Sequence, residues 1–404
     1  MNDRKFKGMQ IARTQQIRKT ERGYIVPSQN GHGTYLVTED RLFPNIKICT
    51  CPDYELRKQP CKHIFAVQCF ITKEVDSEGN ITVTQIKRIT YAQEWSAYNK
   101  AQTSELKLFD ELLKDLLESV PESIQKMGRP RLPLREQLFC SIIKVYSQLS
   151  SRRASMLYAY ATDRGFIAHK PYFNVVSTLL NREDITPILL EFVKKTALPL
   201  STVETDFAVD SSGFRTTSFN VYCKEKHKTT QTHKWLKAHI CIGTKTNVVT
   251  SVVVSDEHVN DSPQFIPLVN ATVDAGFAVH EVSADKAYNS TDNYNVVDSI
   301  GGVAYIPYKS NTTATVGRTG NKGRLWRKMF HYFKLNQDEF YEHYHKRSNV
   351  ETTFSAIKKK LGETIKSKNR TAQVNELLCK IIAYNITVLI QEIHELGIEP
   401  KFVF

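Results

Sequence analysis

Four side chains that could bind a soft metal ion stand close together near the N-terminus. Cys49 and Cys51 are separated by one residue, and so are Cys61 and His63, which follow after a polar loop. Three thiolates and one imidazole form a tetrahedral ligand set that zinc prefers, and four protein ligands leave no position open for a substrate. These residues could also be unrelated, but two pairs so closely spaced favour a structural Zn²⁺ site.

Acidic residues in the C-terminal half suggest a second chemistry. Asp210 and Asp285 each follow an apolar run and precede small or turn residues, in VDSSGF and SADKAY. This pattern predicts two strands that end at these aspartates, with both side chains at the carboxyl edge of a sheet, where α/β proteins form their sites. Asp206 is a competing candidate in the first strand, but it lies in mid-strand. One such aspartate alone is more often a cap or turn residue.

Glu351 is the only acid within the basic segment YHKRSNVETTFSAIKKK, residues 344–360. At about 100° per residue on a helix, it shares one face with Tyr344, Arg347 and Lys358. The simplest interpretation is an i,i+4 salt bridge from Arg347 to Glu351 on a solvated face. The two strand-end aspartates favour a different one, in which Glu351 is the third member of a carboxylate group.

Three carboxylates that meet at one edge repel one another unless cations lie between them. Two Mg²⁺ or Mn²⁺ ions about 4 Å apart would meet this need and would support phosphoryl transfer by activating a water or a 3′-hydroxyl. Arg347 and Lys358 would hold DNA phosphates beside the metals, and Tyr344 would stack on a base or donate to a phosphate. The pattern therefore predicts metal-dependent chemistry on nucleic acid.

The segment GRTGNKGRLWRK, residues 317–328, is rich in cations and contains no acid. Arg324 could bind phosphates and Trp326 could stack on a base, as in proteins that grip a DNA strand. An exposed loop with Trp326 partly buried is an equally good interpretation.

The composition agrees with a polyanionic partner. Lys and Arg outnumber Asp and Glu by 55 to 42, which gives a formal net charge of +13 and a pI of about 9.2 and favours binding to phosphates. No apolar run reaches the roughly 20 residues of a membrane span, and the polar, basic N-terminus does not resemble a signal peptide. We expect a protein of the reducing cytoplasm with no membrane partner.

The elements that must position these residues fall into zones. We predict a multidomain α/β protein, with strands in the order β-β-β-α-β-α-β-α over residues 201–370. The preceding zones are a small β-rich zinc finger, connecting strands and a helix that end in a GRPR linker, and an all-helical region. That helical region is either helix-turn-helix-like and DNA-binding or a plain bundle. The predicted bounds are 20–75, 76–133 and 134–200, followed by 201–370 and a C-terminal core helix at 371–404.

The spacing Tyr344-x₂-Arg347-x₃-Glu351-x₆-Lys358 resembles the Y-R-E-K signature of prokaryotic insertion-sequence transposases with a DDE triad. VDSSGF and SADKAY resemble the two aspartate motifs of that family, and Cys-x-Cys-xₙ-Cys-x-His resembles the SWIM zinc finger. The resemblance implies an RNase H-like fold of the retroviral integrase superfamily. It further implies that Asp210, Asp285 and Glu351 bind the catalytic Mg²⁺ ions.

The implied activity is cleavage of double-stranded DNA at the terminal inverted repeats of a transposon and joining of the freed 3′-hydroxyl to target DNA. It also implies a homodimer or larger assembly in the synaptic complex, associated with the nucleoid. Two alternatives are a domesticated, non-enzymatic DNA-binding regulator and another RNase H-like nuclease. The intact set of acids and the neighbouring Tyr, Arg and Lys favour the transposase.

Overall fold

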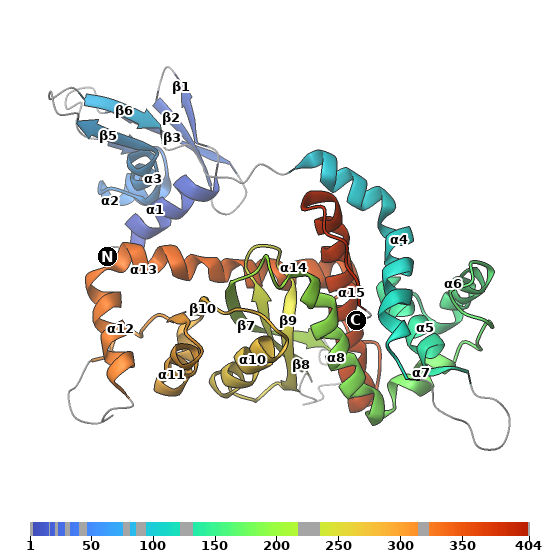
Figure 1. The fold of residues 1–404 in the computed structure, drawn as a ribbon. Coiled ribbons are helices and arrows are strands. Elements are labelled where there is room, and N and C mark those ends of the chain that lie inside the picture. Colours follow the sequence, from blue (N-terminus) through green and yellow to red (C-terminus); the bar gives the residue numbers. More distant parts are fainter. Residues whose placement is uncertain are drawn as a thin grey trace, which may run out of the picture. The chain divides into compact units, whose positions relative to one another are not determined.

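The computed structural model describes residues 3–15, 17–20, 23–28, 33–39, 47–75, 81–85, 94–121, 132–216, 235–313 and 323–402. The chain divides into two compact units, Met1–Gln93 and Glu94–Phe404 (Figure 1). Each unit has its own hydrophobic core.

The first unit is built on a four-stranded antiparallel sheet. Its strands are β1 (Arg18–Thr20), β2 (Gly23–Pro27), β3 (Thr34–Glu39) and β4 (Lys47–Cys49), which pair in chain order. β2 and β3 pair as an antiparallel hairpin, with Pro27 opposite Thr34. The helices are α1 (Asp3–Thr14), α2 (Pro52–Arg57) and α3 (Lys62–Phe70), and a separate ladder joins β5 (Ile71–Val75) to β6 (Ile81–Gln85).

Helix α1 belongs to the core of this unit, although it precedes the predicted finger. It crosses α3 at Gly8, where a Cβ atom would lie 2.5 Å from the Cβ of Phe65 and 2.7 Å from the carbonyl of Lys62. Ile11 and Ile17 are buried in the same cluster as the three cysteines. The zinc-ligand region therefore packs against the segment that precedes the predicted finger.

The second unit begins with helices. They are α4 (Trp95–Glu118), α5 (Leu134–Tyr146), α6 (Ser151–Asp163), α7 (Val175–Leu180) and α8 (Thr186–Ala197), with 3₁₀ turns η1 (Glu183–Ile185) and η2 (Leu198–Leu200). Residues 134–200 are therefore helical as predicted. The GRPR linker lies outside the described residues. That these helices bind DNA stays a prediction.

A five-stranded mixed sheet forms the centre of the second unit. The strands β7 (Asp206–Arg215), β8 (Trp235–Gly243) and β9 (Val249–Asp256) form an antiparallel meander, with a short turn between β8 and β9. β10 (Glu281–Ala284) and β11 (Val303–Tyr305) extend the sheet parallel to β7, in the order β11-β10-β7-β8-β9. The predicted order of strands and helices is confirmed.

Helices cover both faces of this sheet (Figure 1). They are α10 (Ser262–Asp274), α11 (Thr291–Ser299), α12 (Arg324–Leu335), α13 (Gln337–Tyr344), α14 (Ser348–Leu361) and α15 (Arg370–Glu395), with 3₁₀ turns η3 (Lys286–Tyr288) and η5 (His345–Arg347). Side chains alternate between faces along a strand. The even-numbered Ser212 of β7 contacts α14, and the odd-numbered Ser211 contacts Asp261 at the start of α10. The two helices therefore lie on opposite faces.

Two expectations about local structure were wrong. β7 does not end at Asp210 but continues to Arg215, because it stays paired with β8 up to Trp235; at Gly213 the nearest atom of the Trp235 indole would be 3.0 Å from a Cβ. The segment from Tyr344 to Lys358 is not one regular helix, because η5 separates α13 from α14.

Helix α15 is the core helix that its apolar residues predict. It is the one helix in the described part of the chain that is long and apolar enough to cross a membrane. However, 83% of its most apolar window is buried inside the protein. Asn385 at its middle bonds both the N–H and the carbonyl of Val249 in β9, at 2.9 and 2.8 Å. These contacts tie α15 to the edge of the sheet.

Candidate metal and nucleic-acid site

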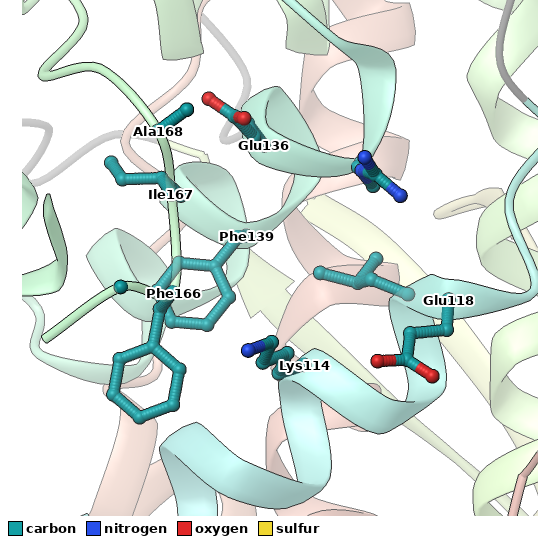
Figure 2. Close-up of a pocket in the computed structure, with 10 residues that line it drawn as sticks. Lys114, Glu118, Glu136, Phe139, Phe166, Ile167 and Ala168 are labelled. Carbon is teal, nitrogen blue, oxygen red and sulfur yellow. The ribbon is translucent and has the colours of Figure 1, made fainter.

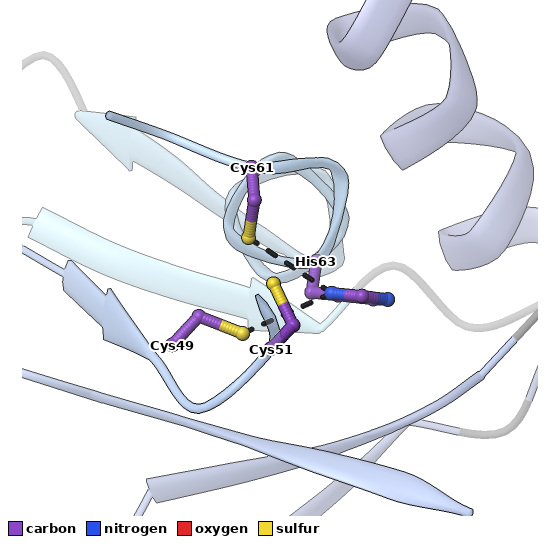
Figure 3. Close-up of side chains that lie close together, drawn as sticks. All are labelled: Cys49, Cys51, Cys61 and His63. Atoms are coloured by element: carbon purple, nitrogen blue, oxygen red, sulfur yellow. Dashed lines mark hydrogen bonds between the residues drawn. The ribbon is translucent and has the colours of Figure 1, made fainter. Parts of the chain in front are cut away.

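The four predicted zinc ligands converge in the first unit (Figure 3). Cys49 ends β4, Cys51 precedes α2, Cys61 precedes α3, and His63 lies in its first turn. One ligand atom from each lies within 4.8 Å of all the others, and all four residues are buried. His63 Nδ1 is 3.8 Å from Cys49 Sγ and 3.9 Å from Cys61 Sγ, close to the ~3.6 Å edge of a zinc tetrahedron with bonds of about 2.0–2.3 Å.

The protonation of these cysteines also fits a cation. A hydrogen bond with Cys61 and burial raise the pKa of Cys49, while the same hydrogen bond lowers the pKa of Cys61. Three thiolates this close cannot all ionise unless a positive charge lies between them. The residues therefore form a Cys₃His zinc site, and the imidazole of His63 is fixed by the ring of Tyr35, 4.6 Å away between centroids.

The register between β10 and β7 places Asp210 and Asp285 at neighbouring positions on adjacent strands. β10 runs parallel to β7 with Ala284 beside Val209, and the next residue on each strand is an aspartate. β10 stops at this point, whereas β7 continues. Asp285 therefore lies at a strand end as predicted, and Asp210 lies where its strand loses its neighbour on one side.

Arg347 joins Asp210 to Glu351. One guanidinium nitrogen lies 2.6 Å from Asp210 Oδ2 and the other 2.5 Å from Glu351 Oε1. The predicted i,i+4 salt bridge from Arg347 to Glu351 is therefore present, but it is half of a bridge between α14 and β7. Glu351 remains exposed, with 61% of its side chain accessible, whereas Arg347 and Asp210 are largely buried.

Electrostatics place Asp285 in the same group. Burial raises the pKa of Asp210, the Ser211 N–H and the charge of Arg347 lower it, and the charges of Asp285 and Glu351 raise it. These are hard carboxylate oxygens of the kind that Mg²⁺ binds, so the donor set fits a divalent cation. Within the part of the chain that the structure describes, however, only the Cys₃His cluster brings three or more ligand atoms within 4.8 Å.

The other members of the predicted basic face lie beside these acids. Lys358 donates to Ser212 Oγ at 2.7 Å, and its ammonium lies 5.2 Å from the centre of the Phe214 ring. The guanidinium of Arg347 lies 5.8 Å from the ring centre of Tyr344, whose pKa is raised by burial. An open groove of about 490 Å³ runs along this face, and its lining includes Asp210, Glu351, Lys358 and Lys359.

The two residues predicted in the basic loop lie elsewhere, since neither lines the groove. Residues 317–322 lie outside the described residues, and Arg324 is exposed at the start of α12. Trp326 is partly buried, with its indole N–H donating to Asn289 Oδ1 at 2.8 Å and its ring stacked on Phe330. The partly buried alternative for Trp326 therefore describes this structure, and contacts of both residues with DNA stay a prediction.

Sequence reasoning missed a polar network behind Asp210, on the opposite face of the sheet. Ser211 donates its N–H to Asp210 Oδ1 and its hydroxyl to Asp261 Oδ1, both at 2.8 Å. Lys237 Nζ lies 2.6 Å from the same Asp261 oxygen. Burial lowers the pKa of nearby His239 to about 4, so this imidazole is neutral near pH 7. The residues come from distant segments, and no motif marks them.

A second missed group anchors η5 to the sheet. Lys346 Nζ lies 2.6 Å from Asp206 Oδ2 and 2.7 Å from Glu281 Oε2. His343 Nδ1 is 2.9 Å from Glu281, and its ring is stacked on Tyr305. Asp206, the competing candidate, thus has a partner of its own, four residues from Asp210 on the same face of β7.

A separate pocket of about 320 Å³ lies between α4, α5 and the loop after α6 (Figure 2). Phe139 and Phe166 are stacked on one side, and Lys114, Glu118 and Glu136 are among the charged residues around it. None of the predicted site residues lines this pocket.

Comparisons with known proteins give two family matches. Residues 201–386 match the transposase DDE domain, and residues 46–67 match the SWIM zinc finger, a range that includes all four zinc ligands. No curated protein sequence matches the chain. Among solved structures, the chain is similar to the piggyBac transposase in its synaptic complex with hairpin DNA, at 10% identity and a TM-score of 0.36, over 73% of this chain and 77% of that one.

Proposed function

We propose that this chain, which carries a transposase DDE domain behind a SWIM zinc finger, is a transposase that cuts and joins DNA at the ends of a mobile element. The observation that supports this most directly is the junction of β7, β10 and α14. There, Asp210, Asp285 and Glu351 surround a single arginine beside an open groove.

We assign the large sheet to the RNase H-like fold. Three antiparallel strands followed by two strands parallel to the first, in the observed order, support this assignment. In such a sheet the first and fourth strands lie side by side, so their aspartates meet at one edge. Helix α14 packs on the face of β7 that carries the even-numbered side chains, and it contributes Glu351 from there.

Two Mg²⁺ or Mn²⁺ ions held by Asp210, Asp285 and Glu351 would activate a water or a 3′-hydroxyl and stabilise the leaving oxygen. Cleavage breaks a phosphodiester bond at the element end and leaves a 3′-hydroxyl. In the joining step, that hydroxyl attacks a target phosphodiester in line and displaces the target's own 3′-oxygen. Arg347 would then leave its two carboxylates and bind a DNA phosphate through its bidentate fork.

Lys358 and Tyr344 complete the DNA-binding face in this proposal. The Lys358 ammonium donates to the neutral hydroxyl of Ser212, so its charge can also neutralise a phosphate. Arg324 and Trp326 would contact the strand outside the groove. The zinc site is structural, and the zinc finger unit would hold the protein on double-stranded DNA or on a second protomer of a synaptic dimer or larger assembly.

The test is DNA-end cleavage and strand transfer by purified protein with Mg²⁺ and the DNA that flanks the gene. Asp210→Asn, Asp285→Asn and Glu351→Gln should each abolish both reactions, because each removes a charged ligand, and should leave end binding within a fewfold of wild type. Normal cleavage by Glu351→Gln would exclude the triad. Retained binding with no cleavage by the wild-type protein would favour a regulator, and cleavage without end specificity would favour another nuclease.

A further inference from the structure

Three lysines converge on a small cavity at the end of α14. Lys144 comes from α5, Lys366 from the loop after α14, and Lys380 from α15. The carboxylate of Glu376, one turn before Lys380, also lines the cavity. Lys144 and Lys380 are 8% and 2% exposed, which is unusual for lysine unless an anionic partner is present.

The local hydrogen bonds leave this cavity positively charged. Glu376 uses its two oxygens on the backbone N–H groups of Lys366 and Ser367, at 2.9 and 2.8 Å. Lys380 Nζ donates to the carbonyls of Gly362 and Thr364, at 2.6 and 3.0 Å. Neutral carbonyls supply hydrogen bonds but no charge, so three ammonium groups face one carboxylate.

Lys144 is the member without a partner. Lys366 Nζ donates to the carbonyl of Gln148, whereas the Lys144 ammonium has no hydrogen bond or ion pair among the described residues. Its charge nonetheless acts on its neighbours, because it lowers the pKa of both Lys366 and Lys380. An anion in the cavity would bring this ammonium the counter-charge that the neighbouring carbonyls do not supply.

We propose that this cavity is a phosphate subsite, formed by Lys144, Lys366 and Lys380. Its volume of about 10 Å³ holds roughly one atom of the size of a water oxygen. One non-bridging phosphate oxygen would enter beside Lys144, and the rest of the group would lie at the mouth, where Lys366 and Gln148 are exposed.

The DNA backbone is one source of this phosphate, and this part of the inference rests on the proposed function. Leu361 ends α14 and lines the cavity, and Glu351 lies ten residues earlier on the same helix. Ten residues of α-helix span about 15 Å, or roughly four to five nucleotide steps at 3.4 Å per step. A duplex that enters the catalytic groove is therefore long enough to reach this cavity.

Inorganic phosphate tests the site without DNA. The thermal unfolding midpoint of the second unit should rise with phosphate relative to chloride at equal ionic strength, because the ligand binds only the folded state. Lys144→Met should lose most of that rise, because it removes one of the three ammonium groups that line the cavity. Lys107→Met, on the exposed face of α4, is the matched control and should keep the full rise. An undiminished rise in both Lys144→Met and the exposed-site variant Lys366→Gln would overturn the proposal.

The second arm identifies the source. With duplex element ends, Lys144→Met and Lys366→Gln should each reduce the dependence of log K on log salt by about one unit, because one phosphate contact is lost. Loss of the phosphate effect with unchanged DNA binding would assign the site to free phosphate and would overturn the DNA assignment. Absence of cleavage by the wild-type protein would contradict the proposed function alone, because the phosphate arm does not depend on catalysis.

Discussion

Arg347 is the residue that connects the acids beside the open groove most directly. Its guanidinium contacts Asp210 and Glu351 from a largely buried position. The planar guanidinium gives each of these carboxylates its own nitrogen, whereas a lysine would offer both of them a single charged atom. The arginine thus offsets the charges of both acids, and its two partners line the groove.

Arg347→Met should lower the free energy of unfolding by about 1–3 kcal/mol, because it leaves a buried carboxylate with fewer partners. Mg²⁺ should stabilise this variant more than it stabilises the wild-type protein, since the cation no longer competes with the guanidinium. Chemical denaturation with and without Mg²⁺ measures both effects. An equal response to Mg²⁺ in the two proteins would argue against a shared position for arginine and metal.

At the residue scale, chemistry was more predictable from sequence than conformation. The zinc ligands could be predicted because two short segments each supply a pair. Gly213 could not, since a glycine after two serines usually marks a turn, and its actual role is to make room for Trp235 on the neighbouring strand. The buried position of Lys144 was equally invisible, because a lysine in a helix is solvated unless another element covers it.

At the scale of elements, the connection between α13 and α14 fixes where the glutamate lies. Lys346 in η5 joins Asp206 of β7 to Glu281 of β10, and the next residue, Arg347, reaches Asp210. Consecutive residues therefore hold two points on the same face of β7. The α13–α14 connection is set against the sheet by charge as well as by the buried stripe that includes Val350, Ile357 and Leu361.

Lys346→Met should destabilise the second unit by about 1–3 kcal/mol and should lower cleavage more than DNA binding, because Arg347 and Glu351 lose their anchor. Burial lowers the pKa of Lys346, but hydrogen bonds to Asp206 and Glu281 outweigh this effect and raise the pKa above its usual value. Its stabilisation is therefore complete below about pH 10.5 and is lost as the pH rises through the higher folded-state pKa.

Chemical denaturation between pH 6 and 11 measures the difference in the free energy of unfolding between wild type and Lys346→Met. Lys346→Arg is the control that keeps the charge. The gap between wild type and the methionine variant should be constant up to about pH 10 and should close above it. A gap that narrows between pH 6 and 8 would assign the effect to another group.

The order of elements was predictable because apolar runs of strand and helix period alternate clearly from Val203 to the end. The two aspartates could be assigned to adjacent strands for the same reason. The 3₁₀ turn at His345–Arg347 could not be predicted, because the residues in it are compatible with a continuous helix. It depends on the contacts of Lys346 and Arg347 with the sheet.

At the scale of the whole molecule, the chain has two hydrophobic cores, and the zinc site belongs to one of them. The core of the first unit contains the zinc ligands, and the core of the second unit contains none of them. Zinc should therefore matter for one unit only. The sequence predicted the finger, but it did not indicate that α1 would pack against it, because the helix carries few apolar residues.

Cys49→Ser, or treatment with a chelator, should remove zinc and shift the unfolding of the first unit to lower temperature, because structural zinc contributes directly to folding. The transition of the second unit should not move. Calorimetry together with zinc analysis measures both, and Cys140→Ser, which alters a buried cysteine of the second unit, is the matched control. Full zinc content in Cys49→Ser would contradict the four-ligand site.

The alternation of side chains between the two faces of β7 determines how this strand tolerates insertions and deletions. Even-numbered residues of the strand meet η5 and α14, and odd-numbered Ser211 meets Asp261. Removal of one residue between Asp206 and Asp210 would exchange these two faces beyond the deletion. Asp210 would then point toward Asp261, acid against acid, while a serine would face Arg347. The insertion or deletion of a single residue between Asp206 and Asp210 should thus inactivate the protein, whatever residue it adds or removes.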